Sequence, residues 1–197
     1  MLCVCACLNH ISAKQALHSG FGFGFGFGFG LLKQKMILKM NDTHWKNRIV
    51  PSERVLEKIR PGMNIFLGTA AAEPRTLVKH LMTSDAANLL DPELSQLVSL
   101  DAISLKAYHS RKYRVKTFFS GWQASEAITA GLADLIPSRY SQIPQVIRSG
   151  QIPVDVGFVQ ITPPDKAGYC SLGVSVDVAR QAMELASLTV GEINHPF

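Results

Sequence analysis

Cysteine is scarce in most of this sequence, which excludes a framework of disulfide bonds. Of the four cysteines, three lie at positions 3, 5 and 7, and Cys170 stands alone in the rest of the chain. Proteins of oxidising compartments commonly depend on paired cysteines, so we expect a reducing, cytoplasmic location. The sequence also lacks an apolar run long enough to span a bilayer, and we expect no membrane partner.

Negative charge is absent from residues 1–40, which carry four lysines. Residues 41–197 hold the other 16 basic residues and all 15 acidic residues, so their excess of positive charge is one unit. A nearly neutral body does not favour a nucleic-acid-binding face. Basic residues do surround Tyr113, but we interpret them as the solvated approach to a strand and expect no nucleic-acid partner.

Motifs for phosphate, dinucleotide and metal sites are also missing. There is no G-x-x-x-x-G-K-[ST] loop, no G-x-G-x-x-G between a strand and a helix, and no H-x-x-E-H or related spacing. The cysteines near the start have no further Cys or His ligands at suitable spacing, so we expect no metal and no bound cofactor. Cys170 has no candidate base near it in sequence, and we interpret it as a packing residue rather than a nucleophile.

The chain instead contains five Phe-Gly repeats at residues 21–30. Glycine weakens any strand that alternating phenylalanines could form, so residues 1–40 are predicted to be a low-complexity, disordered N-terminal extension. Met36 and Met40 are candidate start sites, because Asn41 opens a normally patterned sequence. The second predicted unit is one α/β domain over residues 41–197.

Helix and strand patterns alternate through this domain. Helices are predicted at 53–59, 74–81, 91–92 onward, 125–132, 141–147 and 177–185, and strands at 63–67, 97–105, 115–119, 134–136, 154–161 and 188–193. The apolar run at 154–161 is typical of a strand that is buried on both faces. The alternation predicts a mostly parallel sheet flanked by helices, whose ligands bind at the carboxyl ends of the strands.

The loop after the first of these strands contains the small residues Gly68, Thr69 and Ala70. Small residues let a ligand approach the backbone, and the helix that follows presents free N–H groups. A binding role is therefore one interpretation, and a tight turn that needs small residues for packing is the other. Glu73 is interpreted as an acid that stabilises the start of the helix rather than as a catalytic residue.

Two later loops also follow predicted strands. In the loop at residues 120–122, Trp122 is either a binding residue or a core residue. The longer loop after the strand at 154–161 carries the binding candidates Pro164, Asp165, Gly168, Tyr169, Ser171 and Gly173. Glycine permits the positive φ of a structured loop, and the tyrosine offers a ring and a hydroxyl group. Structured loops at strand ends are often functional, so we expect a binding role here.

Together these loops resemble the acetyl-CoA hydrolase/transferase family, which includes 4-hydroxybutyrate and succinyl-CoA:acetate CoA-transferases. The strongest motif is PPDKAGYCSLGVSVD at residues 163–177, which is similar to the family pattern PPD-x-x-G-[FY]-x-S-L-G-x-x-x-D. Supporting motifs lie in the same order at residues 59–62, 68–70, 73–74, 119–122 and 191–194. The resemblance extends from about Trp45 to Asn194.

This resemblance implies the first of two similar α/β domains, with an active site between them. It implies an acyl-CoA thioester and a short-chain carboxylate as substrates, in acetate or related metabolism. In the family, a glutamate of the second domain attacks the thioester, and a mixed anhydride and a glutamyl-CoA thioester follow. Thr69 lies where a small hydroxyl residue lines the acyl pocket in some members, and the loop from Pro164 to Gly173 is expected to face the cleft.

The sequence departs from the family pattern because it ends before the second domain. Neither Glu73 nor Glu192 matches the nucleophile of the family, so we expect the 197 residues alone to be inactive and a missing C-terminal domain to be a partner. An exposed half-interface is expected to favour association, including a homodimer. The alternatives are an inactive fragment with a binding or assembly role, and an isomerase or sugar-phosphate enzyme on a related fold.

Overall fold

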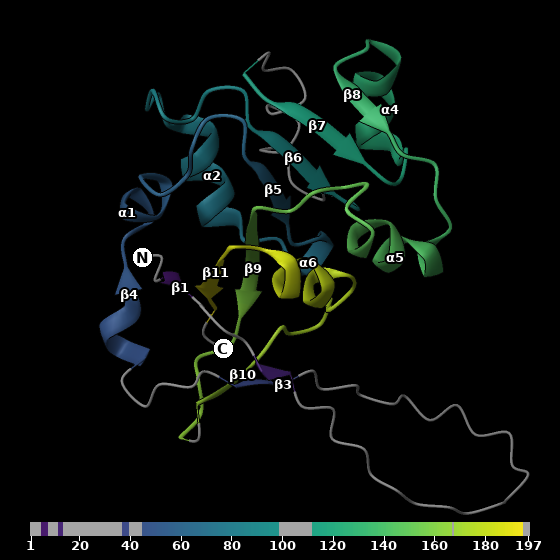
Figure 1. The fold of residues 1–197 in the computed structure, drawn as a ribbon. Coiled ribbons are helices and arrows are strands. Elements are labelled where there is room, and N and C mark those ends of the chain that lie inside the picture. The colour runs from purple at the N-terminus through teal and green to yellow at the C-terminus, as the bar shows by residue number, and fades with distance from the viewer. Residues whose placement is uncertain are drawn as a thin grey trace, which may run out of the picture.

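An eight-stranded sheet forms the centre of the computed structural model, which describes residues 5–7, 12–13, 37–39, 45–98, 112–166 and 168–194. The strand order is β4-β1-β11-β9-β5-β6-β7-β8 (Figure 1). The parallel strands, from one side to the other, are β11 (Leu188–Ile193), β9 (Val156–Ile161), β5 (Asn64–Leu67), β6 (Glu93–Gln96), β7 (Arg114–Thr117) and β8 (Ala133–Leu135). The mostly parallel α/β sheet predicted from the sequence is therefore confirmed.

At one edge of the sheet the pairing changes to antiparallel. There β1 (Cys5–Cys7) pairs with β11 on one side and with β4 (Ile49–Val50) on the other, and the short helix η1 (Trp45–Arg48) precedes β4. A second, smaller antiparallel sheet consists of β10 (Tyr169–Ser171), β3 (Ile37–Lys39) and β2 (Ser12–Ala13).

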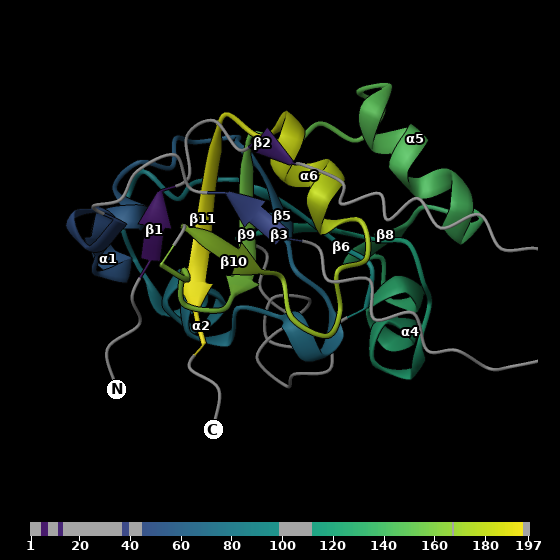
Figure 2. The ribbon, with the colours of Figure 1, turned by 90° about the horizontal axis from the view of Figure 1, so that it is seen from below.

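Helices cover both faces of the main sheet (Figure 2). The helices α1 (Ser52–Leu56), α2 (Arg75–Thr83) and α4 (Trp122–Thr129) pack on one face, and α5 (Ile143–Arg148) and α6 (Ala179–Leu185) pack on the other. The described residues contain no helix that is long and apolar enough to cross a membrane.

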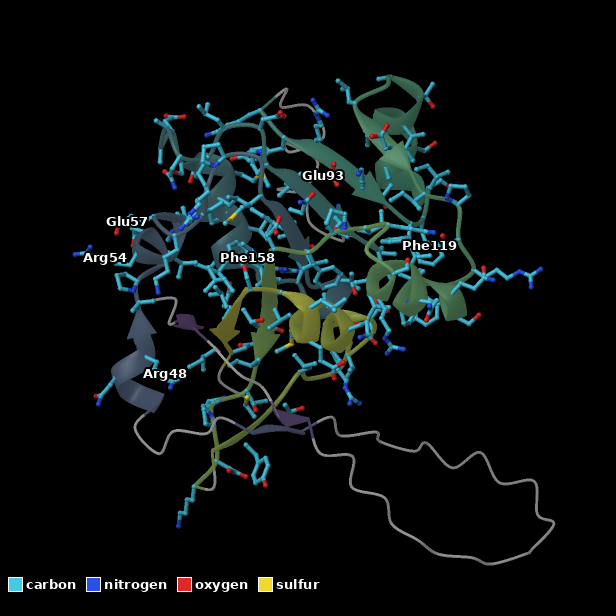
Figure 3. The ribbon with its side chains drawn as sticks, in the orientation of Figure 1. Arg48, Arg54, Glu57, Glu93, Phe119 and Phe158 are labelled. Carbon is cyan, nitrogen blue, oxygen red and sulfur yellow. The ribbon has the colours of Figure 1, made fainter. Side chains whose placement is uncertain are left out.

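The central strands are apolar on both sides because each side faces a helical layer. On β5, Ile65 and Leu67 belong to the core under α1 and α2, whereas Phe66 between them belongs to the core under α5 and α6. On β9, Phe158 and Val159 divide in the same way, and Figure 3 shows Phe158 inside the fold. Continuous apolar runs such as these are what a doubly covered parallel sheet requires.

Three short segments of the predicted extension are strands rather than disordered chain, namely β1, β2 and β3. The Phe-Gly repeats at 21–30 lie outside the described residues. Disorder of the extension therefore remains a prediction for the rest of residues 1–40.

The prediction of a helix that starts at Asp91 is wrong. Asp91 has a φ of +50° and lies in a bend, and the carbonyl of its neighbour Leu90 accepts the N–H of Gly62, in the distant loop before β5, at 3.0 Å. Strand β6 begins two residues later and is hydrogen-bonded by β5 and β7 on its two sides. Pairing on both sides therefore overrides the local helix signal, and most of the strand predicted at 97–105 lies outside the described residues.

Candidate functional site

The candidate site lies at the carboxyl ends of the parallel strands, where one carboxylate joins three segments. Thr69, two residues after β5, donates its hydroxyl hydrogen to Oδ2 of Asp177 at 2.7 Å. Tyr140, in the short helix η3 (Tyr140–Gln142) after β8, donates to Oδ1 of Asp177 at 2.5 Å. Asp177 itself lies just before α6, so its two oxygens connect the loops after β5 and β8 to the start of that helix.

Tight backbone packing explains the small residues around Thr69. The N–H of Gly68 donates to the carbonyl of Phe158 at 2.8 Å, and a Cβ at Gly68 would lie 2.8 Å from the carbonyl oxygen of Ala72. Ala70 has a φ of +51°. For these two positions the geometry favours the tight-turn interpretation, whereas the hydroxyl of Thr69 points into the cluster with Asp177.

An aromatic pair lies beside this cluster. The rings of Phe119, which follows β7, and Tyr140 are stacked with their centroids 6.4 Å apart and their planes 27° apart. Figure 3 shows Phe119 close to α5. Burial, together with the hydrogen bond to Asp177 and its charge, raises the pKa of Tyr140 to about 12. The phenol therefore remains a hydrogen-bond donor at neutral pH.

The longest predicted binding loop is an ordered hairpin. Oδ1 of Asp165 accepts the N–H of Tyr169 at 2.8 Å, and the N–H of Asp165 donates to the carbonyl of Tyr169 at 2.8 Å. Gly168 and Gly173 have φ values of +80° and +77°, as expected for glycines that let a loop turn. Further along, Oγ of Ser171 accepts the N–H of Gly173 at 3.1 Å.

The structure therefore brings together only part of the predicted site. Thr69 meets Asp177 and Tyr140, two residues that were not among the binding candidates. The candidates Asp165, Gly168, Tyr169 and Ser171 belong to the hairpin that carries β10, and Pro164, at its start, is partly exposed. Trp122 begins α4, but its side chain lies outside the described residues.

A buried carboxylate stabilises the start of α2. Oε2 of Glu192, on β11, accepts the N–H groups of Leu77 at 2.9 Å and of Thr76 at 3.1 Å. The side chain of Glu192 is buried, as is that of Glu73. Glu192 thus caps the start of α2 through backbone groups that the helix itself leaves unpaired, and the similar role that the sequence predicts for Glu73 stays a prediction.

Cys170 is a core residue. It is 2% exposed and packs in the core under α5 and α6. Burial, with a smaller contribution from the charge of Asp165, raises the pKa of its thiol to about 11. The thiol therefore stays protonated at neutral pH, which supports the packing interpretation. The part of the chain that the structure describes holds no group of three or more His, Cys, Asp or Glu side chains that could bind a metal ion.

Comparison with known sequences identifies relatives. The profile of the acetyl-CoA hydrolase/transferase N-terminal domain matches residues 33–197. The 4-hydroxybutyrate coenzyme A transferase of Clostridium kluyveri is 31% identical over 151 residues, which are 76% of this chain and 35% of that protein. The succinyl-CoA:acetate/propanoyl-CoA:succinate CoA transferase of Fasciola hepatica is 34% identical over 137 residues, which are 69% of this chain and 28% of that protein. The chain thus spans about a third of the length of the curated relatives it matches.

Solved structures share the fold. RipA from Yersinia pestis has a TM-score of 0.59 and 21% identity, and the match covers 70% of this chain and 34% of RipA. The 4-hydroxybutyrate CoA-transferase from Porphyromonas gingivalis has a TM-score of 0.51 and 24% identity, and the match covers 73% of this chain and 32% of that one.

Proposed function

The chain belongs to the acetyl-CoA hydrolase/transferase family, and we propose that it is the acyl-binding first domain of an enzyme that transfers coenzyme A between carboxylates or hydrolyses acyl-CoA. The observation that carries this proposal is the family match over residues 33–197, which includes the cluster of Thr69, Tyr140 and Asp177. That cluster lies at the carboxyl ends of parallel strands, where ligands of such sheets bind.

The bond-making group in this proposal is a glutamate of a second domain that the 197 residues do not contain. Its carboxylate attacks the thioester carbonyl and expels the CoA thiolate, which leaves a mixed anhydride. The thiolate then attacks the glutamyl carbonyl, releases the first carboxylate and forms a glutamyl-CoA thioester. An incoming carboxylate, or water in a hydrolase, completes the turnover.

The residues of this chain bind and orient the acyl group. Thr69 and the backbone of Gly68 and Ala70 are proposed to line the acyl pocket, and Trp122 is retained as a proposed binding residue. The hairpin residues Pro164, Asp165, Gly168, Tyr169, Ser171 and Gly173 are proposed to face the second domain across the cleft. Substrates are an acyl-CoA and a short-chain carboxylate, in a cytoplasmic protein that can form a homodimer.

Thioester turnover tests the proposal. The purified 197-residue chain is expected to release no CoA thiol from acetyl-CoA and to exchange none between carboxylates. A chimera that joins the chain to the remaining part of the Clostridium kluyveri relative is expected to do so. Turnover by the chain alone would reveal an overlooked nucleophile, and a folded but inactive chimera would favour the inactive-fragment alternative.

In the chimera, Tyr169→Ala tests the hairpin. We expect kcat/KM to fall while the thermal midpoint stays unchanged, since Tyr169 is only partly buried. Unchanged kinetics would assign Tyr169 to packing.

A further inference from the structure

The short strand β1 joins β4 to the rest of the main sheet. Ala6 pairs with Gly191 of β11 on one side and with Ile49 of β4 on the other, and Cys5 is paired on both sides in the same way. Among the described strands, β4 is hydrogen-bonded to β1 alone, and Figure 2 shows β1 alongside β11. The place of β4 in the sheet therefore depends on residues 5–7.

The two strands that flank β1 belong to the family domain, whereas β1 does not. The family match begins at residue 33, so it includes β4 and β11 and excludes residues 5–7. Neighbouring strands of a sheet lie about 4.8 Å apart, so β4 and β11 are held about 10 Å apart with one strand between them. We call this space the strand slot, and its sides are residues 49–50 of β4 and 190–192 of β11. The slot is thus built by the family domain and filled from outside it.

The β11 side of the slot is buried and is held in place by a second strand. All six residues of β11 pair in parallel with β9. Val190 is fully buried, and Glu192, whose carboxylate caps α2, is buried as well. Backbone N–H and C=O groups of β11 that point away from β9 would have no strand partner in an empty slot, and unpaired backbone groups are costly in a buried place. The slot therefore favours an extended segment that supplies the missing hydrogen bonds.

The segment that fills the slot comes from a separate part of the chain. Residues 8–44 connect β1 to η1, which precedes β4. Because backbone hydrogen bonds carry the pairing, the slot selects an extended conformation more than a particular sequence. A tether raises the effective concentration of a segment near its binding site to about millimolar. The segment at residues 5–7 therefore has the properties of a ligand that is attached to its own receptor.

We propose that the strand slot is a docking site for an extended peptide segment, and that residues 5–7 of this chain are its intramolecular occupant. The N-terminal extension then acts as a built-in ligand, which completes the sheet by adding an antiparallel strand to the family domain. The interaction surface consists of the backbone edges of β4 and β11 and involves no acyl-CoA, so the inference stands or falls separately from the proposed function.

Competition by a peptide tests this docking. A fluorescein-labelled peptide of residues 1–10, which contains β1 and ends before β2, is titrated in reducing buffer with the full 197-residue chain, and fluorescence anisotropy reports its binding. In the wild-type chain the tethered segment competes with the peptide for the slot. Ala6→Pro removes an N–H group from the middle of a strand that is paired on both sides, where proline is not tolerated. We expect the peptide to bind the Ala6→Pro chain at least about tenfold more tightly than the wild-type chain.

Ala13→Pro is the matched control. Ala13 lies in the same extension but on β2, which forms the edge of the small sheet and, among the described strands, pairs with β3 alone. We expect this variant to bind the peptide as weakly as the wild-type chain does. Equal binding by all three chains would overturn the inference, and so would the absence of binding by an Ala6→Pro chain whose circular dichroism shows a native fold.

A second measurement needs no proline variant. A protease site inserted between residues 9 and 10 lets β1 be cut from β2 after the chain has folded. The released piece is expected to stay with the body of the protein at micromolar concentration in size-exclusion chromatography, and its immediate separation would overturn docking at the slot. A wild-type dimer that Ala6→Pro converts to a monomer would show that a second copy fills the slot, which would overturn the intramolecular assignment.

Discussion

The carboxylate of Glu192 offers a sharp test of how β11 and α2 are held together. Glu192→Ala leaves the N–H groups of Thr76 and Leu77 without this acceptor, inside a part of the fold where the glutamate is 8% exposed. Hydrogen bonds to a charged group contribute about 1.5–3 kcal/mol each, so the loss of two is expected to lower the free energy of unfolding by about 3–5 kcal/mol. Glu192→Gln keeps one acceptor oxygen and is expected to cost about 1–2 kcal/mol.

Guanidinium chloride unfolding, followed by circular dichroism, measures these differences. The matched control is Glu184→Ala, which removes an ion pair with Arg180 whose two side chains are 30% and 33% exposed, and it is expected to cost about 0.5 kcal/mol. Hydrogen exchange adds a local reading, because the amides of Thr76 and Leu77 are expected to lose protection in Glu192→Ala. If the Glu192 and Glu184 alanine variants were equally stable, the capping role would be refuted.

Three further results are expected. Gly68→Ala places a Cβ 2.8 Å from the carbonyl oxygen of Ala72 and is expected to destabilise the fold by about 1–3 kcal/mol. In the control Gly157→Ala the nearest atom to the new Cβ is 3.7 Å away, so the thermal melt is expected to show a smaller loss of stability. A variant with Cys3, Cys5 and Cys7 replaced by serine keeps Cys170 as its only thiol, and a pKa of about 11 leaves roughly one such thiol in a thousand ionised at pH 8. Iodoacetamide is therefore expected to label Cys170 only after unfolding, and fast labelling of the folded protein would contradict its burial. Asp177→Asn should lower the pKa of Tyr140 from about 12 toward 10, since a neighbouring negative charge is lost. Titration followed by carbon-13 spectra of the tyrosines measures this pKa, with Tyr140→Phe to assign the signal. An unchanged pKa would contradict the effect of Asp177.

Strands with local apolar patterns could be predicted from the sequence, and strands that depend on their neighbours could not. The strand predicted at 154–161 contains the whole of β9, because Val156, Phe158 and Val159 are apolar and meet the requirement for burial by themselves. Strand β6 contains the buried polar residues Ser95 and Gln96, whose position depends on pairing with β5 and β7. Such pairing is a tertiary property, which local composition does not encode.

The same distinction applies to the site. Thr69 could be singled out because it lies in the loop of small residues after a predicted strand. Tyr140 could not, because its link to Asp177 spans 37 residues and arises only when the loops after two strands meet at one edge. A structured loop around Gly168 was predicted from its glycines and prolines, but not that it forms a hairpin. The pairing of this hairpin with residues 37–39 joins segments more than a hundred residues apart, one of which resembled disordered chain.

The pairing of β3 with β10 also has a consequence for translation. Met36 directly precedes β3 and Met40 directly follows it. A polypeptide begun at Met36 keeps the strand that pairs with Tyr169, Cys170 and Ser171, whereas one begun at Met40 leaves that edge of the hairpin without this partner. Starts at Met36 and at Met40 would thus encode two forms of the same loop, one in which β3 pairs with β10 and one in which β10 lacks this partner.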